Sequence, residues 1–187
     1  MKKIVLDEKS VVIGNLSKLS HVNNDILKNH IFSNFNEQNR ASNDIFNSLF
    51  NYHKLPYHLH VHWLKDYIRD FYAAEFENIV LYPVLNIKDN LFFILKKNES
   101  LISHTHIDEH DLKNSPDYTC IYNVFSGKTK SHIFFEYNKG RDKQKKWKID
   151  LEPGKFVVFS SSLYFYINKN ENEEEHINLC FNYNSTI

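Results

Sequence analysis

The spacing of hydrophobic residues changes once along the chain, at about Asn78. Before that point apolar residues recur at helical intervals, most clearly from about His58 to Glu75, where Leu59, Trp63 and Tyr67 follow one another at every fourth position. After it, short apolar runs alternate with polar or turn-forming segments, which is typical of β-strands. The pattern predicts a helical N-terminal section followed by a sheet-rich region.

The N-terminal section divides further. Two short apolar runs between Met1 and about Gly14 indicate strands, and helical spacing then extends from Asn23 to about His53. Asp25 and Ser42 are the residue types that cap helix N-termini, so we expect two short helices to begin near them.

The sheet-rich region contains many short strands at even spacing, which favours a β-sandwich or jelly roll with the helices packed on it. We therefore predict a mainly β, α+β fold in a single domain of residues 1–187, with a mostly helical section at 1–78 and a β core at 79–187. The expected strands are Ile79–Tyr82, Leu91–Leu95, Tyr118–Val124, His132–Tyr137, Trp147–Leu151, Phe156–Phe159, Tyr164–Ile167 and His176–Asn182.

Composition limits the possible partners. Lys and Arg number 23 and Asp and Glu number 23, so net charge gives no reason to expect a nucleic acid or an anionic membrane as partner. No apolar run reaches the length of a membrane span, and Asp7 interrupts the start before a signal-peptide core forms. Cys120 and Cys180 lie in apolar runs, which favours free, buried thiols. We expect a cytoplasmic protein.

The strongest chemical signal is a cluster of possible metal ligands before the polar segment at 109–117. In an extended strand His104, His106, Asp108 and His110 would share one face, because side chains alternate between faces. Two histidines and one carboxylate with open coordination positions suit non-haem Fe(II). The alternative is a solvated strand end whose histidines bond to each other and to water.

A second histidine cluster, His58, His60 and His62, also alternates. On a strand these side chains would share a face, as metal ligands must, but on the predicted helix they spread around the cylinder. We interpret them as ordinary, partly exposed histidines.

With these elements in place, the region from Asn90 to Tyr183 resembles the Fe(II)/2-oxoglutarate-dependent oxygenase superfamily, and within it the prolyl-hydroxylase-like branch. The likeness rests on a His-x-Asp motif, the strand after it, a run similar to P-G-x-hydrophobic-hydrophobic-F-P-S, and a closing strand similar to R-I-S-I-S-F-N. These segments are His106–Asp108, Tyr118–Asn123, Leu151–Ser161 and His176–Asn182.

The resemblance implies a double-stranded β-helix with Fe(II) and 2-oxoglutarate as cofactors. His106 and Asp108 would hold the iron, 2-oxoglutarate would chelate it, and an unidentified small molecule or side chain would be hydroxylated. A sibling jelly roll, the cupin, has a His-x-His motif that His104 and His106 also fit.

Two family positions carry other residues. The second metal histidine would fall at or next to Phe165, and the arginine that pairs with 2-oxoglutarate would fall at His176. A protonated His176 would supply that cation, and the alternative is a polar residue at the start of a strand. A third metal ligand would come from His104 or His110 on the same strand, from His132 or His176 on other strands, or would be missing.

A second class of function therefore stays open. If the third ligand is missing, the chain is a catalytically inactive or repurposed jelly roll that binds a ligand or partner, and Tyr164, Phe165 and Tyr166 would line a pocket. Metal binding is the property that separates the two classes.

Overall fold

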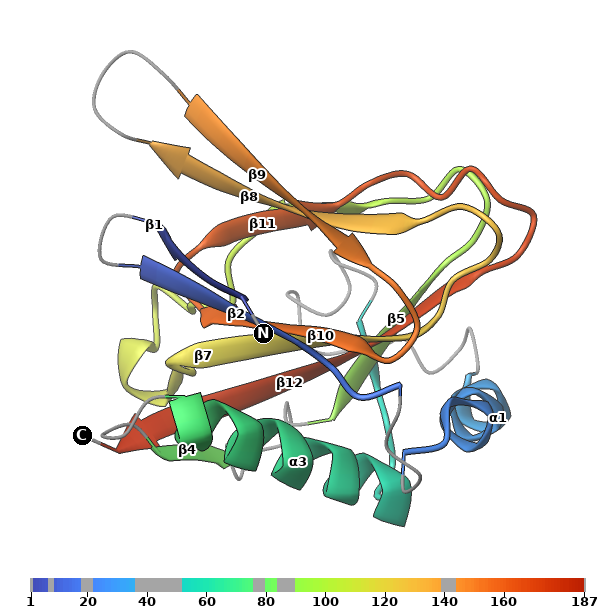
Figure 1. The fold of residues 1–187 in the computed structure, drawn as a ribbon, viewed down its shortest axis with the longest axis horizontal. Coiled ribbons are helices and arrows are strands. Elements are labelled where there is room, and N and C mark those ends of the chain that lie inside the picture. The colour runs from blue at the N-terminus through green and yellow to red at the C-terminus, as the bar shows by residue number, and fades with distance from the viewer. Residues whose placement is uncertain are drawn as a thin grey trace.

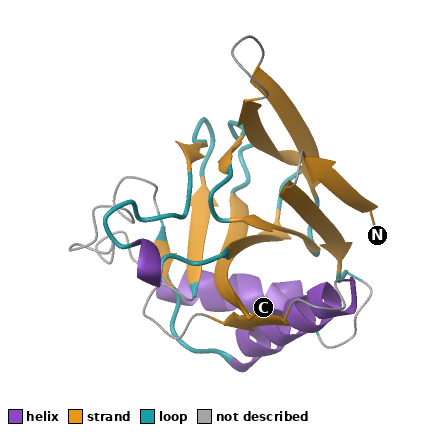
Figure 2. Ribbon diagram, turned by 90° about the vertical axis from the view of Figure 1, so that its left-hand side faces the viewer, coloured by secondary structure: helices purple, strands orange, loops and turns teal. Residues whose placement is uncertain are grey.

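The structure is a computed structural model that describes residues 2–6, 9–17, 22–35, 52–75, 80–83, 90–138 and 144–186. Two antiparallel sheets stack on each other, and the helices cover the outer face of the larger sheet (Figure 1). Figure 2 shows the same layers from the side, with the helices gathered along one edge of the molecule. This mainly β arrangement confirms the predicted jelly roll with helices packed on it.

The larger sheet has the strand order β1, β2, β10, β7, β12, β5, β3, and β4 also pairs with β12. Its strands are β1 (Lys2–Leu6), β2 (Lys9–Asn15), β10 (Lys155–Ser160), β7 (Tyr118–Phe125), β12 (His176–Thr186), β5 (Leu91–Leu95), β3 (His53–Lys54) and β4 (Val80–Pro83).

The smaller sheet has the order β6, β11, β8, β9. Its strands are β6 (Leu101–His104), β11 (Tyr164–Ile167), β8 (Ser131–Asn138) and β9 (Gln144–Leu151). A short 3₁₀ helix, η2 (Leu112–Asn114), lies in the connection between β6 and β7.

Helix α3 (Leu59–Glu75) confirms the predicted helix at about His58 to Glu75. Its buried stripe runs through Leu64, Ile68 and Tyr72, whereas Trp63 is 39% exposed. The stripe that begins at Leu59 is exposed at its start, whereas Tyr67 and Phe71 further along it are partly buried and pack against the core.

The N-cap of helix α1 (Asn24–Asn34) lies two residues before the predicted cap, Asp25. Asn23 is the N-cap, and its side-chain oxygen accepts hydrogen bonds from the backbone N–H groups of Asp25 and Ile26. The prediction that Asp25 is the cap was wrong, because Asn23 caps the helix two residues earlier and Asp25 lies inside its first turn. The helical prediction was also wrong at His53, which belongs to β3, while Ser42 lies outside the described residues.

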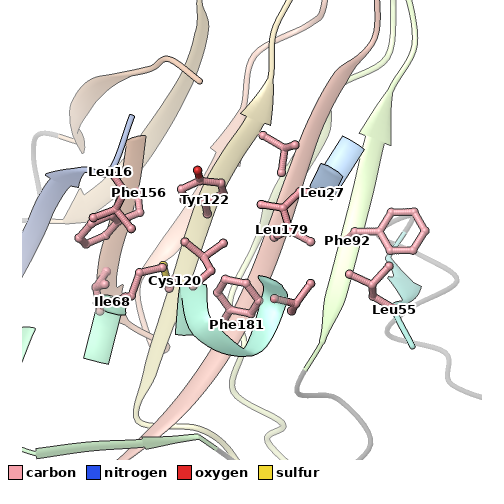
Figure 3. Packing of buried hydrophobic residues seen from close by; sticks show 14 of the residues in the cluster. Leu16, Leu27, Leu55, Ile68, Phe92, Cys120, Tyr122, Phe156, Leu179 and Phe181 are labelled. Carbon is pink, nitrogen blue, oxygen red and sulfur yellow. The ribbon is translucent and has the colours of Figure 1, made fainter. Parts of the chain in front are cut away.

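The core is divided by the larger sheet. One cluster of apolar side chains lies between this sheet and the helices, where Leu16, Ile68, Phe156 and Phe181 pack together (Figure 3). A second cluster lies between the two sheets and includes Phe165. Both cysteines are free and buried, as predicted.

Neither of the two α-helices in the described ranges is long and apolar enough to cross a membrane.

Candidate functional site

Two of the predicted ligands meet inside the sandwich. Strand β6 ends at His104, and His106 lies in the bend that follows. The backbone N–H of His106 donates to the Ser161 carbonyl at 2.9 Å. Both side chains are buried, with 4% of His104 and 6% of His106 exposed. Their Nε2 atoms converge on the Tyr52 hydroxyl, at 3.1 Å for His104 and 3.0 Å for His106.

The opposite ring nitrogens are held by oxygen acceptors. Nδ1 of His104 lies 2.8 Å from the Ile102 carbonyl oxygen, and Nδ1 of His106 lies 3.1 Å from the side-chain oxygen of Asn182. Because these oxygens only accept, each Nδ1 carries the hydrogen and donates it. A neutral imidazole has one N–H, so a neutral ring that donates from Nδ1 turns the lone pair of Nε2 toward Tyr52.

The polar chain continues past His106 across the interior. The Thr119 hydroxyl donates to Asn182 at 3.3 Å and lies 2.8 Å from the Ser161 hydroxyl. Thr119, Ser161 and Asn182 are all buried. These side chains come from β7, β12 and the turn after β10, so the sheet pairing itself brings them together.

Phe165 stands next to both histidines. It is paired with His104 between β11 and β6, and its ring centroid lies 4.5 Å from that of His104 and 5.5 Å from that of His106. An apolar ring therefore packs against the imidazoles at the position where the resemblance implied a second metal histidine.

Asp108 and His110 lie apart from the buried side chains of His104 and His106. Both are exposed, because the chain turns after His106 and closes a hydrogen bond from Asp111 N–H to the Asp108 carbonyl. The Asp108 carboxylate accepts from the His110 N–H at 2.9 Å, and the Asp108 N–H donates to Ser115. The prediction of one shared face thus holds only for His104 and His106, since an extended strand does not continue to His110.

The other two candidate histidines lie elsewhere. His132 on β8 has its Nδ1 2.9 Å from a carboxylate oxygen of Asp150 on β9. His176 is buried at the start of β12, and its Nε2 contacts the Asn172 amide at 3.2 Å. Burial, followed by repulsion from His132, lowers the pKa of His176. A lowered pKa opposes the protonated form that an anchor for 2-oxoglutarate would need.

Burial also determines the protonation states of His104 and Tyr52. It lowers the pKa of His104 to about 4, against a smaller opposing effect of its bond to Ile102. Burial, then Cys180, raises the pKa of Tyr52. At neutral pH, without a bound cation, His104 is neutral and Tyr52 keeps its proton.

The positions of these side chains do not fit the iron site that the resemblance implied. The described residues contain no group of three or more His, Cys, Asp or Glu side chains placed to hold a metal ion. His106 is buried, Asp108 bonds to its own exposed turn, and the described Arg69 pairs with Asp66 and Asp70 on α3. Arg40 and Arg141 lie outside the described residues.

The remaining histidine cluster matches its interpretation as ordinary side chains. His58 stacks between His30 and His60, with ring centroids 4.2 and 5.5 Å away. Burial and the two neighbouring rings lower the pKa of His58. His62 is exposed and pairs with Asp66 at 3.4 Å.

A surface pocket of about 360 Å³ lies on the outer side of α3. The described residues that line it, Trp63, Asp66, Tyr67 and Asp70, follow the i, i+3, i+4, i+7 spacing of one helical face. Two aromatic rings and two carboxylates therefore stand together on this face of α3.

Sequence reasoning missed Tyr52 and the chain from Asn182 to Ser161. Alternation along β12 gave a usable signal for Asn182, because a polar residue at every second position of an apolar strand faces a different environment from its neighbours. Tyr52 gave none, since it is a lone aromatic residue in a stretch with helical spacing.

Comparison with known proteins gives the fold and no closer relationship. The sequence matches no family model and no curated protein. Among solved structures, a non-haem monooxygenase, ThoJ in complex with nickel, matches with a TM-score of 0.59 and 12% identity over 94% of this chain and 73% of that one.

A Pseudomonas putida prolyl-4-hydroxylase also matches with a TM-score of 0.59, at 8% identity over 95% of this chain and 93% of that one. The apo form of ThoJ gives 0.55 at 10% identity, over 94% and 74%. At such low identity these matches concern architecture alone. The chain therefore has the jelly-roll fold of non-haem oxygenases.

Proposed function

We propose that this chain is a repurposed member of the oxygenase-type jelly rolls that binds a ligand or partner and does not carry out Fe(II)/2-oxoglutarate chemistry. The observation that supports this most directly is the packing of Phe165 on His104 and His106 at 4.5 and 5.5 Å. A phenyl ring offers no lone pair to a metal, so the face that would complete an iron site is apolar.

Two further contacts support the proposal. The hydroxyl of Tyr52 faces the Nε2 atoms of both histidines, where an oxygenase needs open positions for cosubstrate and dioxygen. The carboxylate of Asp108 is engaged in its own turn by the His110 N–H. Iron at His106 would therefore lack both its carboxylate and its open face.

The test is an anaerobic titration of the full chain with Fe(II), followed by 2-oxoglutarate. We expect no visible charge-transfer absorption of an iron-bound 2-oxoacid and no rise in melting temperature that depends on 2-oxoglutarate, because only a bound ligand stabilises the folded state. Either signal, if lost on His106→Ala, would overturn the proposal and establish an oxygenase-type cofactor site.

The pocket on α3 is the ligand surface that we assign to this function. Trp63 and Tyr67 offer ring faces, and Asp66 and Asp70 offer negative charge beside them. Cations bind over aromatic faces, and a nearby carboxylate adds to the attraction. Arg69 pairs with both Asp66 and Asp70, so one guanidinium faces two carboxylates. The described lining is therefore net negative, which favours a small organic cation.

Titration with tetramethylammonium tests this assignment through tryptophan fluorescence. Trp63 lines the pocket, whereas Trp147 lies on β9 and serves as an internal reference. We expect a saturable change in the wild type that is absent in Trp63→Leu and weakened in Asp70→Asn. An equal change in all three proteins would mean that the pocket does not bind the probe.

A further inference from the structure

We infer that His62 makes cation binding in the α3 pocket depend on pH, because its protonated ring competes with the bound cation for the Asp66 carboxylate. The inference rests on the proposed ligand surface and adds a means of regulating that same site. His62 lies on α3, as do the four described residues that line the pocket.

The His62 ring stands directly beside the pocket. Its Nε2 lies 3.4 Å from Oδ2 of Asp66, one helical turn further along α3. The His62 side chain is 52% exposed, so solvent reaches the imidazole. Histidine side chains ordinarily gain their charge between about pH 8 and 5. A change of pH in this range therefore acts on a carboxylate of the pocket lining.

The two oxygens of Asp66 have different partners. Oδ1 lies 2.8 Å from Nη1 of Arg69, whereas Oδ2 faces His62. A neutral imidazole carries no charge, so Oδ2 keeps its attraction for a cation in the pocket. A protonated imidazole pairs with Oδ2 as an ion pair, and both oxygens of Asp66 then face a positive charge. The cation and the proton on His62 therefore exclude each other.

The charge of the described lining changes with the same proton. Arg69 also reaches Asp70, with Nη2 3.1 Å from Oδ1, so one guanidinium faces two carboxylates while His62 is neutral. Once His62 is protonated, two positive groups face the two carboxylates. The lining then loses the excess negative charge that favours a cation, although the two aromatic rings stay in place.

The other groups near His62 and the lining act in the same direction or not at all. Tyr57, whose ring centroid lies 6.1 Å from that of His62, belongs to a residue type that is uncharged in this pH range. Lys65 is buried on the inner face of α3. His60 meets the Trp63 ring edge-on at 5.2 Å. A charge on His60 would repel a bound cation but takes no carboxylate from it.

The experiment measures the dissociation constant of tetramethylammonium for the full chain at pH 7.5 and 5.5, at constant ionic strength, from Trp63 fluorescence. Each titration is compared with ligand-free protein at the same pH, since His60 lies beside Trp63. We expect binding to be about two- to fivefold weaker at pH 5.5, which is the range for a solvent-exposed ion pair.

Proton release gives a second readout. Linkage is reciprocal, so a proton that weakens cation binding must itself be displaced when the cation binds. Calorimetry at pH 6.5 in two buffers of different ionisation enthalpy measures this release. We expect a net release from the wild type.

Three variants separate His62 from the other groups. His62→Gln keeps a polar side chain without the charge, so it should lose most of the pH dependence and of the proton release. Asp70→Asn keeps the pair of His62 with Asp66, so it should weaken binding at both pH values and leave their ratio unchanged. His132→Gln changes a histidine on β8 of the smaller sheet, away from the helices, and should behave like the wild type.

The outcomes distinguish this inference from the assignment of the pocket. Equal affinities of the wild type at the two pH values would overturn the inference and leave the pocket in place, as would an unchanged ratio in His62→Gln. Failure of the probe to bind at pH 7.5 would overturn the pocket and this inference with it. Because His62 is exposed, His62→Gln should give the circular dichroism spectrum of the wild type.

Discussion

Strand β12 presents two different environments on its two faces. Ile177, Leu179 and Phe181 face the helices and belong to the apolar cluster beneath α3. The alternating residues Asn178 and Asn182 are equally buried but make side-chain hydrogen bonds. One strand thus separates a core of mainly apolar contacts from an interior that also contains a chain of buried polar side chains.

The two faces of β12 differ more in how specific their side-chain contacts are than in how deeply their residues are buried. Apolar packing tolerates exchange between side chains of similar size, whereas a buried polar group costs free energy unless its partner stands at the right place. The interior between the sheets therefore accepts few substitutions at the positions of its polar chain.

The largest expected effect comes from the helix-facing side. Phe181→Ala removes a fully buried ring and should lower the free energy of unfolding by about 3–5 kcal/mol, through lost transfer free energy and the cavity left behind. Urea denaturation measures the change. Asn184→Ala, an exposed position on the same strand, is the control, and a loss in Phe181→Ala no greater than in this control would contradict the assignment of the core.

Tyr52→Phe tests the interior between the two sheets, because it removes a single hydroxyl oxygen and keeps the ring. In metal-free buffer it should cost about 1–3 kcal/mol, because the buried Nε2 atoms of His104 and His106 lose their shared hydroxyl. Tyr183→Phe is the matched control on the helix-facing side, where the hydroxyl donates a long bond to the Lys65 carbonyl at 3.4 Å. Equal losses in urea denaturation would remove the contrast between the two regions.

Much of the β region was predictable because its cause is local. The alternation of polar and apolar residues gave strands that the structure contains, including Tyr164–Ile167 with the same bounds. The Pro153-Gly154 turn before β10 has a simple reason too, since Gly154 takes a φ of 86° that other residues adopt at a cost. Helix α3 followed from its spacing.

The candidate site was less predictable because it depends on contacts between distant segments. Spacing placed His104 and His106 on one face, but the turn that carries Asp108 away is stabilised by Ser115 and by its own carboxylate. Tyr52 reaches His106 across 54 positions of sequence. No local pattern specifies such a contact, because it arises only when β3 pairs with β5 at the edge of the larger sheet.

A smaller effect should appear as pH dependence on the interior side of β12. The pKa of His176 is lowered by burial, then by His132, so between its folded and unfolded pKa values the unfolded chain binds more protons. Stability is then fully present above about pH 6.5 and falls as the pH drops below that value, by at most about 1.4 kcal/mol per pH unit for one group.

His176→Gln isolates this contribution from those of the other histidines, because glutamine still contacts Asn172 but does not titrate. The free energy of unfolding of both proteins at pH 7.5 and 5.5 gives the comparison. We expect a smaller loss between these values in the variant, and an identical loss would mean that His176 titrates alike in the folded and unfolded states.

The smallest effect is expected at Asp108, where the two interpretations of the histidine cluster differ most. A metal ligand at this position would make Asp108→Ala lose the bound ion, whereas the structure shows an exposed carboxylate that accepts one bond from the His110 N–H. Water replaces that acceptor after substitution, so the loss should be below about 1 kcal/mol. Urea denaturation of the variant and of the wild type measures this loss. A loss as large as that expected for Tyr52→Phe would contradict the exposed position of the Asp108 carboxylate.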